Sequence, residues 1–181
     1  MMQELSLNVL DVTQNSVKAG ATLIAITIAE DTAADRMTIT ITDNGCGMTA
    51  EQVARVVDPF YTTRTTRKVG LGVPFFKMAA ELSGGSFSIE SRVGEGSTVT
   101  AVFGLSSIDR MPLGDMAATM TALIQGNPHI DFVYLRCING REMTADTRQF
   151  RQVLEGVPLD TPDVIAFIGE YINENTSEIT E

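Results

Sequence analysis

The sequence has few cysteines, one histidine and no tryptophan, and it lacks a long apolar run. The two cysteines, Cys46 and Cys137, and His129 stand far apart among 181 residues, in none of the spacings that zinc sites use. This distribution argues against a zinc site and a disulfide framework, and two distant thiols favour a cytoplasmic protein. No run approaches the ~18 apolar residues of a membrane span. The start of the chain lacks the basic and then apolar pattern of a secretory signal.

Positive charge is also scarce. The chain has 13 Lys+Arg against 23 Asp+Glu, a formal net charge of −10, which argues against a partner that is a nucleic acid. The excess of acidic residues lies mainly in residues 105–181, which have 12 acids and 5 bases. Residues 1–104 have 11 acids and 8 bases. With 44% hydrophobic residues the chain can bury a core. The length predicts about one domain and an appendage.

The first 104 residues alternate between helical and strand patterns. Apolar spacing predicts helices over 2–18, over 51–58 after a capping box of Thr49 and Gln52, and from 73 onward. Two-residue alternation predicts strands at 22–30, 36–45, 85–91 and 97–103, while 58–72 has no clear period. Because the strands come as adjacent hairpins, we predict an α+β fold: a two-layer α/β sandwich with a mixed, mainly antiparallel sheet.

The rest of the chain has a different pattern and no motif that we can assign. It predicts a helix over 111–128, a hairpin over 131–147 and two helices over 147–156 and 161–174. Asn139-Gly140 is a candidate type I′ turn for the hairpin. We therefore expect two domains, at 1–105 and 106–181, with the second a small α/β extension of unknown role.

Three groups of residues carry the chemistry. Asn8, Asp11, Asn15 and Lys18 lie on one helical stripe, because their spacings are 3, 4 and 3. Carboxamide, carboxylate and ammonium groups on a stripe can hold a magnesium–phosphate group. Taken alone, this pattern also fits a solvated helix face.

The second group, Asp43-Asn44-Gly45-Cys46-Gly47, follows a strand, where an acid can accept a hydrogen bond from an amine and glycines let a ligand approach. The third, Gly70-Leu71-Gly72, opens a helix, whose free N–H groups favour an anion. Hydroxyl and basic side chains precede it: Thr62, Thr63, Arg64, Arg67 and Lys68. Each of these also fits an ordinary turn.

The order and spacing of the groups are more specific than any one of them. The stretches LDVTQNSVKAGAT, ITITDNGCGM, DPFYTTRTTRKVGLGVPFFKMAAELSGG and VGEGSTVTAVF resemble, in order, four motifs of the GHKL superfamily of ATP-binding domains. This superfamily comprises gyrases, heat-shock chaperones, histidine kinases and mismatch-repair ATPases. The resemblance covers about residues 3–104, is closest to the histidine-kinase-like type, and implies the Bergerat-type ATP-binding fold with ATP and Mg²⁺ as cofactors.

The resemblance implies how the base of ATP is held. Asp43 would receive the adenine amine, Gly45 and Gly47 would shape the base pocket, and Thr98 would support Asp43. At the other end Asn15 would bind Mg²⁺ through the phosphates and Lys18 would touch phosphate. The remaining phosphate contacts expected are Thr63, Arg64, Lys68, Gly70, Leu71 and Gly72.

The sequence departs from the family in two places. Asp11 stands where hydrolysing members have a Glu general base, and its side chain is shorter by about 1.5 Å, so its role as a base stays open. A histidine kinase also needs a phosphoacceptor His on a helix pair upstream, whereas the resemblance begins near residue 3 and His129 sits in a turn context. We therefore do not expect an orthodox sensor kinase.

The preferred function is a stand-alone cytoplasmic regulatory protein, kinase-like or an ATPase, that acts on a separate protein partner. Two alternatives stay open: an ATP-dependent conformational switch with little turnover, and a serine kinase of the anti-sigma type. Whether the protein is an enzyme is thus not decided. We expect no nucleic acid or membrane partner, leave a homodimer open, and expect residues 106–181 to help dock the partner.

Overall fold

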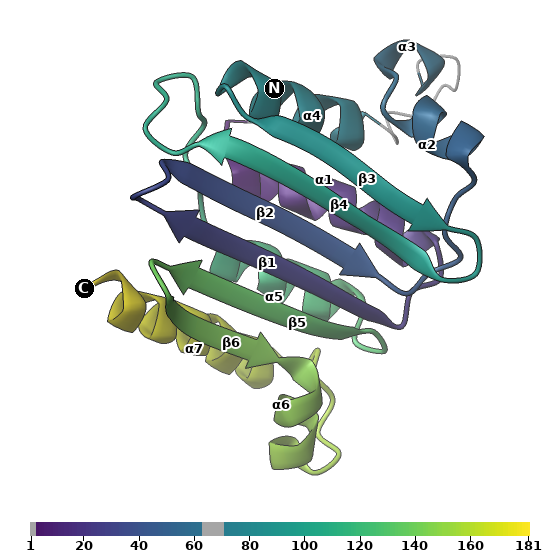
Figure 1. The fold of residues 1–181 in the computed structure, drawn as a ribbon. Helices are drawn as coiled ribbons and strands as arrows, with labels where there is room; N and C mark the ends of the chain where they lie inside the picture. The colour runs from purple at the N-terminus through teal and green to yellow at the C-terminus, as the bar shows by residue number, and fades with distance from the viewer. Residues whose placement is uncertain (1–2, 63–70) are drawn as a thin grey trace.

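The computed structural model describes residues 3–62 and 71–181. Its helices and strands follow the chain as α1 (Leu5–Lys18), β1 (Leu23–Asp31), β2 (Arg36–Asp43), α2 (Ala50–Val56), α3 (Pro59–Thr62), α4 (Gly72–Leu82), β3 (Ser86–Arg92), β4 (Gly96–Gly104), α5 (Met116–Gly126), β5 (Asp131–Ile138), β6 (Arg141–Asp146), α6 (Thr147–Leu154) and α7 (Pro162–Thr180). Figure 1 shows one sheet with α1, α4, α5 and α7 behind it. No helix among these residues is long and apolar enough to cross a membrane.

The sheet has six strands in the order β3-β4-β2-β1-β5-β6. Four neighbouring pairs are antiparallel and one, β1 with β5, is parallel. The parallel pair needs a long crossover, and α5 lies in it. The prediction of an α+β fold with a mixed, mainly antiparallel sheet is therefore confirmed.

Alternation along the strands determines which face the helices cover. In β2, Met37, Ile39 and Ile41 are buried under the helices, while Thr38 and Thr40 point to the other face. The same alternation runs through β1 and β4, because successive side chains of a strand point to opposite faces. The apolar side chains of the sheet and helices form one hydrophobic core.

The C-terminal residues add to this same sheet and core. Strand β5 pairs with β1 along its whole length, and Phe132, Tyr134 and Leu123 are fully or almost fully buried. The β5–β6 hairpin turns at Asn139 and Gly140, whose φ angles of 50° and 85° fit the predicted type I′ turn. The helix, hairpin, helix, helix order expected after residue 105 is that of α5, β5–β6, α6 and α7.

The segment 58–72, which has no clear period, differs from a plain loop at both ends. It starts with the short helix α3, at whose start Oδ1 of Asp58 accepts a 2.9 Å hydrogen bond from the Phe60 N–H. It ends in α4, which begins at Gly72, one residue earlier than predicted. An aspartate cap and a helix start at glycine are local effects that apolar spacing does not reveal.

Candidate functional site

Helix α1 carries the first group of predicted residues beneath one end of the sheet. Leu5, Val9 and Val12 bury one side of this helix in the core. Asp11 and Asn15 are half-buried on the neighbouring side, Lys18 at the end of the helix is exposed, and Asn8 is fully buried. Asn15 and Lys18 line a cavity of about 330 Å³, whereas Asn8 and Asp11 do not, so only the C-terminal half of the stripe expected from the sequence faces a space that a ligand can enter.

Asp43 stands at the end of β2 and at the same cavity. Its Oδ2 accepts a 2.6 Å hydrogen bond from the Ser16 hydroxyl, and its Oδ1 accepts a 2.9 Å bond from the Gly45 N–H. The residue is 9% exposed. Each oxygen can accept a further hydrogen bond, so a fixed acceptor faces the cavity.

The turn after β2 requires glycine because the chain passes close to its neighbours. At Gly47, with φ of 71°, a Cβ would lie 1.9 Å from the carbonyl oxygen of Arg92. At Gly45 a Cβ would lie 2.8 Å from the Cβ of Ala19. Larger residues would force the turn away from the cavity, so these two glycines fix the position of its wall.

The lining of the cavity combines apolar and polar side chains. Its apolar lining comes from helices and strands of both layers and consists of Val12, Val56, Val73, Ile89 and Val99. Its polar lining consists of Ser16, Asn15, Lys18, Gln52, Asp43 and Ser97. A flat apolar group fits between such walls, while a few placed polar groups fix its orientation.

The start of α4 meets α1 next to this cavity. A Cβ at Gly72 would lie 2.7 Å from Oδ2 of Asp11, so the carboxylate packs directly against the first turn of α4. The N-cap residue, Leu71, makes no side-chain cap. The N–H groups of Gly72 and Val73 are in the first turn, where an anion is stabilised, and Pro74 has no N–H to offer.

The structure brings seven of the predicted residues to this region: Asp11, Asn15, Lys18, Asp43, Gly45, Gly47 and Gly72. Leu71 precedes α4 as its N-cap. Four others, Thr63, Arg64, Lys68 and Gly70, lie outside the described residues. A role for them at phosphate stays a prediction.

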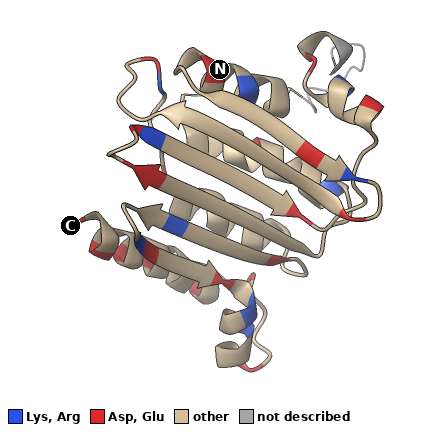
Figure 2. Ribbon diagram, in the orientation of Figure 1, with Lys and Arg blue, Asp and Glu red and all other residues tan. Residues whose placement is uncertain are grey.

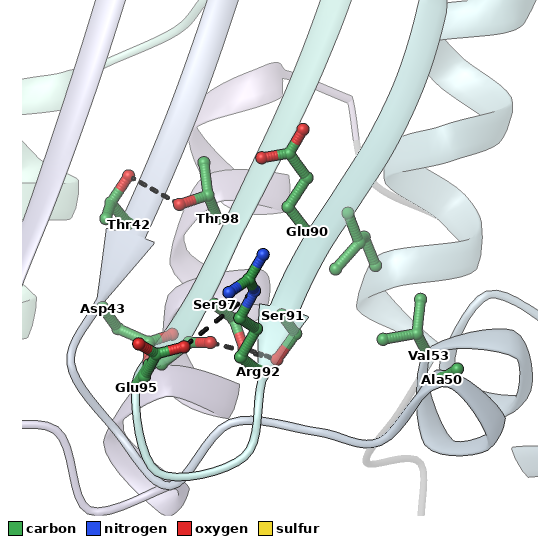
Figure 3. A pocket seen from close by; sticks show the side chains of 12 residues that line it. Thr42, Asp43, Ala50, Val53, Glu90, Ser91, Arg92, Glu95, Ser97 and Thr98 are labelled. Carbon is green, nitrogen blue, oxygen red and sulfur yellow. Dashed lines mark hydrogen bonds and ion pairs between the residues drawn. The ribbon is translucent and has the colours of Figure 1, made fainter.

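Thr98 does not line this cavity, although it lines an adjoining hollow together with Asp43. Its side chain is on the face of the sheet turned away from the helices, where its hydroxyl donates a 3.4 Å hydrogen bond to Thr42 (Figure 3). The residue that pairs with Asp43 across β2 and β4, and that lines its cavity, is Ser97. Ser97 and Ser91 are also hydrogen-bonded, at 2.7 Å. The structure therefore places Ser97, and not Thr98, beside the Asp43 side chain.

A second hollow adjoins the first around the β3–β4 turn. Its volume is about 730 Å³, and Asp43, Ile89 and Ser97 line both spaces. Figure 3 shows its polar rim, where Arg92 and Glu95 form an ion pair of 4.0 Å. Because the two spaces share residues, a ligand bound at Asp43 has room to extend toward this turn.

Sequence reasoning missed Ser16 and Ser97. The alternation of buried Val99 and Phe103 in β4 was a usable signal, because it places Ser97 on the helix-covered face and Thr98 on the other. Ser16 had no such signal, since its partner is 27 residues away and the contact depends on how α1 packs under β2.

Residues 1–107 match the family described as histidine kinase-, DNA gyrase B- and HSP90-like ATPases. The match covers more than half of the chain, so the protein belongs to this family, and the expected GHKL-type ATP-binding domain is confirmed.

Curated relatives agree with this assignment. A putative sensor protein of Shewanella frigidimarina is 31% identical over 59% of this chain and 17% of its own length. Sporulation kinase C of Bacillus subtilis is 30% identical over 54% of this chain and 23% of its own length. The chain thus spans only about a fifth of these relatives.

Solved structures share the fold. The N-terminal domain of a DNA repair protein matches 79% of this chain and 52% of its own, with a TM-score of 0.53 and 17% identity. The Aquifex aeolicus MutL ATPase domain complexed with ADP matches 86% of this chain and 70% of its own, with a TM-score of 0.50 and 16% identity. At these identities the likeness concerns the fold alone.

Proposed function

We propose that the protein binds Mg-ATP in the cavity at Asp43 and acts as a stand-alone cytoplasmic regulator, kinase-like or an ATPase, of a separate protein partner. The observation that carries the proposal is the carboxylate of Asp43, held by Ser16 and Gly45 against apolar walls. Adenine is flat and apolar on its faces and has an amine at its edge. Asp43 accepts that amine while the valine and isoleucine side chains enclose the ring.

The phosphates lie between α1 and the start of α4 in this proposal. Lys18 supplies positive charge, and the N–H groups of Gly72 and Val73 supply donors. Leu71, Gly70, Thr63, Arg64 and Lys68 complete the phosphate contacts. Since α4 has no side-chain cap, an anion can take the place that a cap would otherwise occupy.

The residues present also fit a magnesium ion. The side-chain carbonyl of Asn15 lines the cavity and is a hard oxygen ligand of the kind Mg²⁺ prefers. The described residues contain no cluster of three or more His, Cys, Asp or Glu that could hold a metal, so the ion would be bound by ATP and Asn15 together. When bound, Mg²⁺ neutralises phosphate charge.

Asp11 is the residue proposed to act on the attacking group. Its carboxylate lies against Gly72 at the α4 terminus, where the terminal phosphate is placed. From there it accepts a proton from water, or it orients a hydroxyl or imidazole of another protein. Phosphoryl transfer needs mainly positioning and charge neutralisation, which the same residues provide in either case.

Exposed apolar side chains next to this site support a protein partner. Phe75, Met78 and Leu82 lie on one face of α4 at spacings of 3 and 4 and are 42%, 50% and 64% exposed. A second surface is the acidic C-terminal part, which has six acids and no base from residue 160 onward and would attract a basic partner. Residues 106–181 are the proposed docking segment, and a homodimer is part of the same proposal.

The test is incubation of the pure protein with ATP labelled in its γ-phosphate, alone and with proteins that co-purify with it. Free phosphate indicates an ATPase. Label on a second protein indicates a kinase, and acid treatment then separates acid-labile phosphohistidine from acid-stable phosphoserine. Tight binding with neither product indicates the switch. Absence of ATP binding by calorimetry would refute the proposal, with Asp43→Asn as the matched negative control.

A further inference from the structure

A further cavity lies among α5, α7 and β5, which are neighbours in the C-terminal part of the fold (Figure 1). Its volume is about 360 Å³, enough for a small molecule. We call it the α5 cavity, and it is lined by residues 113–117, by Tyr134 and Arg136 of β5, and by Ile172, Asn173 and Thr176 of α7. It shares no lining residue with the nucleotide cavity or with the hollow beside that cavity.

Tyr134 is one of two buried polar side chains in the wall of the α5 cavity. The residue is 1% exposed, yet its hydroxyl makes no hydrogen bond to any group in residues 3–62 and 71–181. Burial raises the pKa of Tyr134 to about 12, so the hydroxyl keeps its proton at neutral pH and can donate. A buried tyrosine hydroxyl ordinarily has a partner, and a donor that lacks one beside a cavity indicates an acceptor on a ligand.

Arg136 is the other buried polar side chain, and the residue is 6% exposed. One terminal nitrogen of its guanidinium, Nη2, donates to the Glu30 carboxylate. The other, Nη1, lies 3.4 Å and 3.5 Å from the carbonyl oxygens of Ile28 and Cys137. These contacts leave two of the five N–H groups of a guanidinium without a partner in the part of the chain that the structure describes. A guanidinium fork with donors to spare is suited to a carboxylate.

The start of α5 adds backbone donors to the same cavity. Asp115, its N-cap, accepts from the Ala118 N–H through its side chain and from the Thr119 N–H through its carbonyl group. The N–H groups of Met116 and Ala117 have no partner among the described residues, although both residues are 5% exposed and line the cavity. Unpaired N–H groups in the first turn of a helix favour an anion.

We propose that the α5 cavity binds a short aliphatic monocarboxylate, at a site separate from the one proposed for ATP. The carboxylate accepts from the Tyr134 hydroxyl, from the spare N–H groups of Arg136 and from the first turn of α5. The hydrocarbon part lies against Leu113 and Ile172, which are apolar residues of the same lining. Such a mixture of apolar walls and a few fixed donors is typical of small-molecule sites.

Charge favours a monocarboxylate over a phosphate. Glu30 already neutralises Arg136, and the Asp115 carboxylate also lines the cavity, so a doubly charged anion would be repelled more strongly than a singly charged one. The acidic residues along α7 (Figure 2) do not belong to the site, because Glu170, Glu174 and Glu178 are exposed and line none of it. Charges in solvent are screened by salt.

The experiment is a titration of the full chain, labelled with ¹⁵N, followed by amide NMR. Hexanoate, 1-hexanol and inorganic phosphate are the three probes. We expect hexanoate to shift the amide signals of Met116 and Ala117 with a dissociation constant at or below about 1 mM. Hexanol lacks the carboxylate and phosphate lacks the hydrocarbon part, so each should bind at least about tenfold more weakly. The proposal is overturned if hexanoate does not bind, or if either other probe binds equally well.

Tyr134→Phe removes the hydroxyl and keeps the ring. We expect hexanoate affinity to fall about tenfold, in line with a hydrogen bond to a charged group. Stability to urea without ligand should not fall, because the lost hydroxyl has no partner in the described chain. The matched control is Tyr171→Phe, which loses a hydroxyl that donates to the Thr144 carbonyl oxygen and lies outside the lining of the cavity.

The control should keep its hexanoate affinity within about twofold. An unchanged affinity in Tyr134→Phe, or an equal loss in both variants, contradicts the site. The outcome does not depend on ATP, because the two cavities share no lining residue. Failure of hexanoate binding and failure of ATP binding are therefore distinguishable results.

Discussion

The hydroxyl of Ser16 on α1 donates a 2.6 Å hydrogen bond to Oδ2 of Asp43 at the end of β2. The bond joins the two layers of the fold at the cavity. Together with the Gly45 N–H on Oδ1, it fixes the plane and direction of the carboxylate. A ligand amine then meets an acceptor that needs no further ordering, which lowers the entropic cost of binding.

Asp43→Asn should abolish ATP binding, because an amide nitrogen would replace one acceptor oxygen and confront the donors now facing it. Ser16→Ala keeps the carboxylate and loses one bond to it, so we expect affinity about tenfold weaker, in line with hydrogen bonds to charged groups. Isothermal calorimetry measures both. Unchanged affinity in Asp43→Asn would show that ATP binds elsewhere.

Asn15→Ala should weaken ATP binding when magnesium is present and change it little when magnesium is chelated. The reason is that the side-chain carbonyl of Asn15 is proposed to reach the ion and not the base. Calorimetry with magnesium and with EDTA gives the two affinities, and we expect at least a tenfold loss of affinity with magnesium and little loss with EDTA. Equal losses in both conditions would place Asn15 on the nucleotide itself.

Ser97 and Thr98 offer a test of which neighbour of Asp43 matters. Ser97 lines the Asp43 cavity, whereas the Thr98 hydroxyl bonds to Thr42 on the sheet face turned away from the helices. We expect Ser97→Ala to weaken ATP binding several-fold and Thr98→Ala to change it by less than about twofold. Titration of ATP into each variant under the same conditions measures the two affinities. The reverse order of effects would support the role that the family resemblance assigns to Thr98.

Much of the fold was predictable because local patterns determine it. The alternation of Met37, Ile39 and Ile41 with threonines marks β2 as a strand with one covered face, and the structure agrees. The Asn139-Gly140 turn was equally clear, since few residue pairs adopt positive φ at both positions. The motifs that contain Asn15, Asp43 and Gly72 pointed to residues that lie close together in the structure.

What could not be predicted depends on contacts between distant residues. The parallel pairing of β1 with β5 joins residues more than 100 positions apart, and no local pattern specifies a partner strand. Likewise Thr98 and Ser97 differ by one position, and a shift of one residue moves a side chain to the opposite face of the sheet. The family motif locates this strand in the sequence, but it does not determine which of its residues point toward the helices.

Gly72 and Asp11 should show strong coupling. A Cβ at Gly72 would lie 2.7 Å from Oδ2 of Asp11, so Gly72→Ala should displace the carboxylate and reduce both stability and any ATP turnover. An Asp11→Ala background removes the carboxylate and leaves only the Cβ of residue 11, 3.2 Å from the new methyl group, so the same substitution should then cost much less stability. A double-mutant cycle of urea unfolding measures this coupling, which we expect to be about 1 kcal/mol or more. Additive effects would contradict the contact.

Asp146 gives the protein a predictable response to acid. Its Oδ1 accepts from the Arg148 N–H at the start of α6, and the Arg148 guanidinium also bonds to its carboxylate. These hydrogen bonds, above all the side-chain ones, hold the pKa of Asp146 below its usual range. A lowered folded-state pKa stabilises the fold above the unfolded-state pKa, and this contribution is lost as the pH falls through the folded-state pKa.

Asp146→Asn should therefore be less stable than the wild type at pH 7, and the difference should shrink as the pH falls through the acidic range. Asparagine keeps an oxygen that can cap α6, so only the ionic part of the interaction is removed. Asp146→Ala removes the cap as well and should cost about 1 kcal/mol more at every pH. Urea unfolding at a series of pH values compares the three proteins. A gap between wild type and Asp146→Asn that stays constant down to about pH 2 would show that the ionised carboxylate contributes nothing to stability.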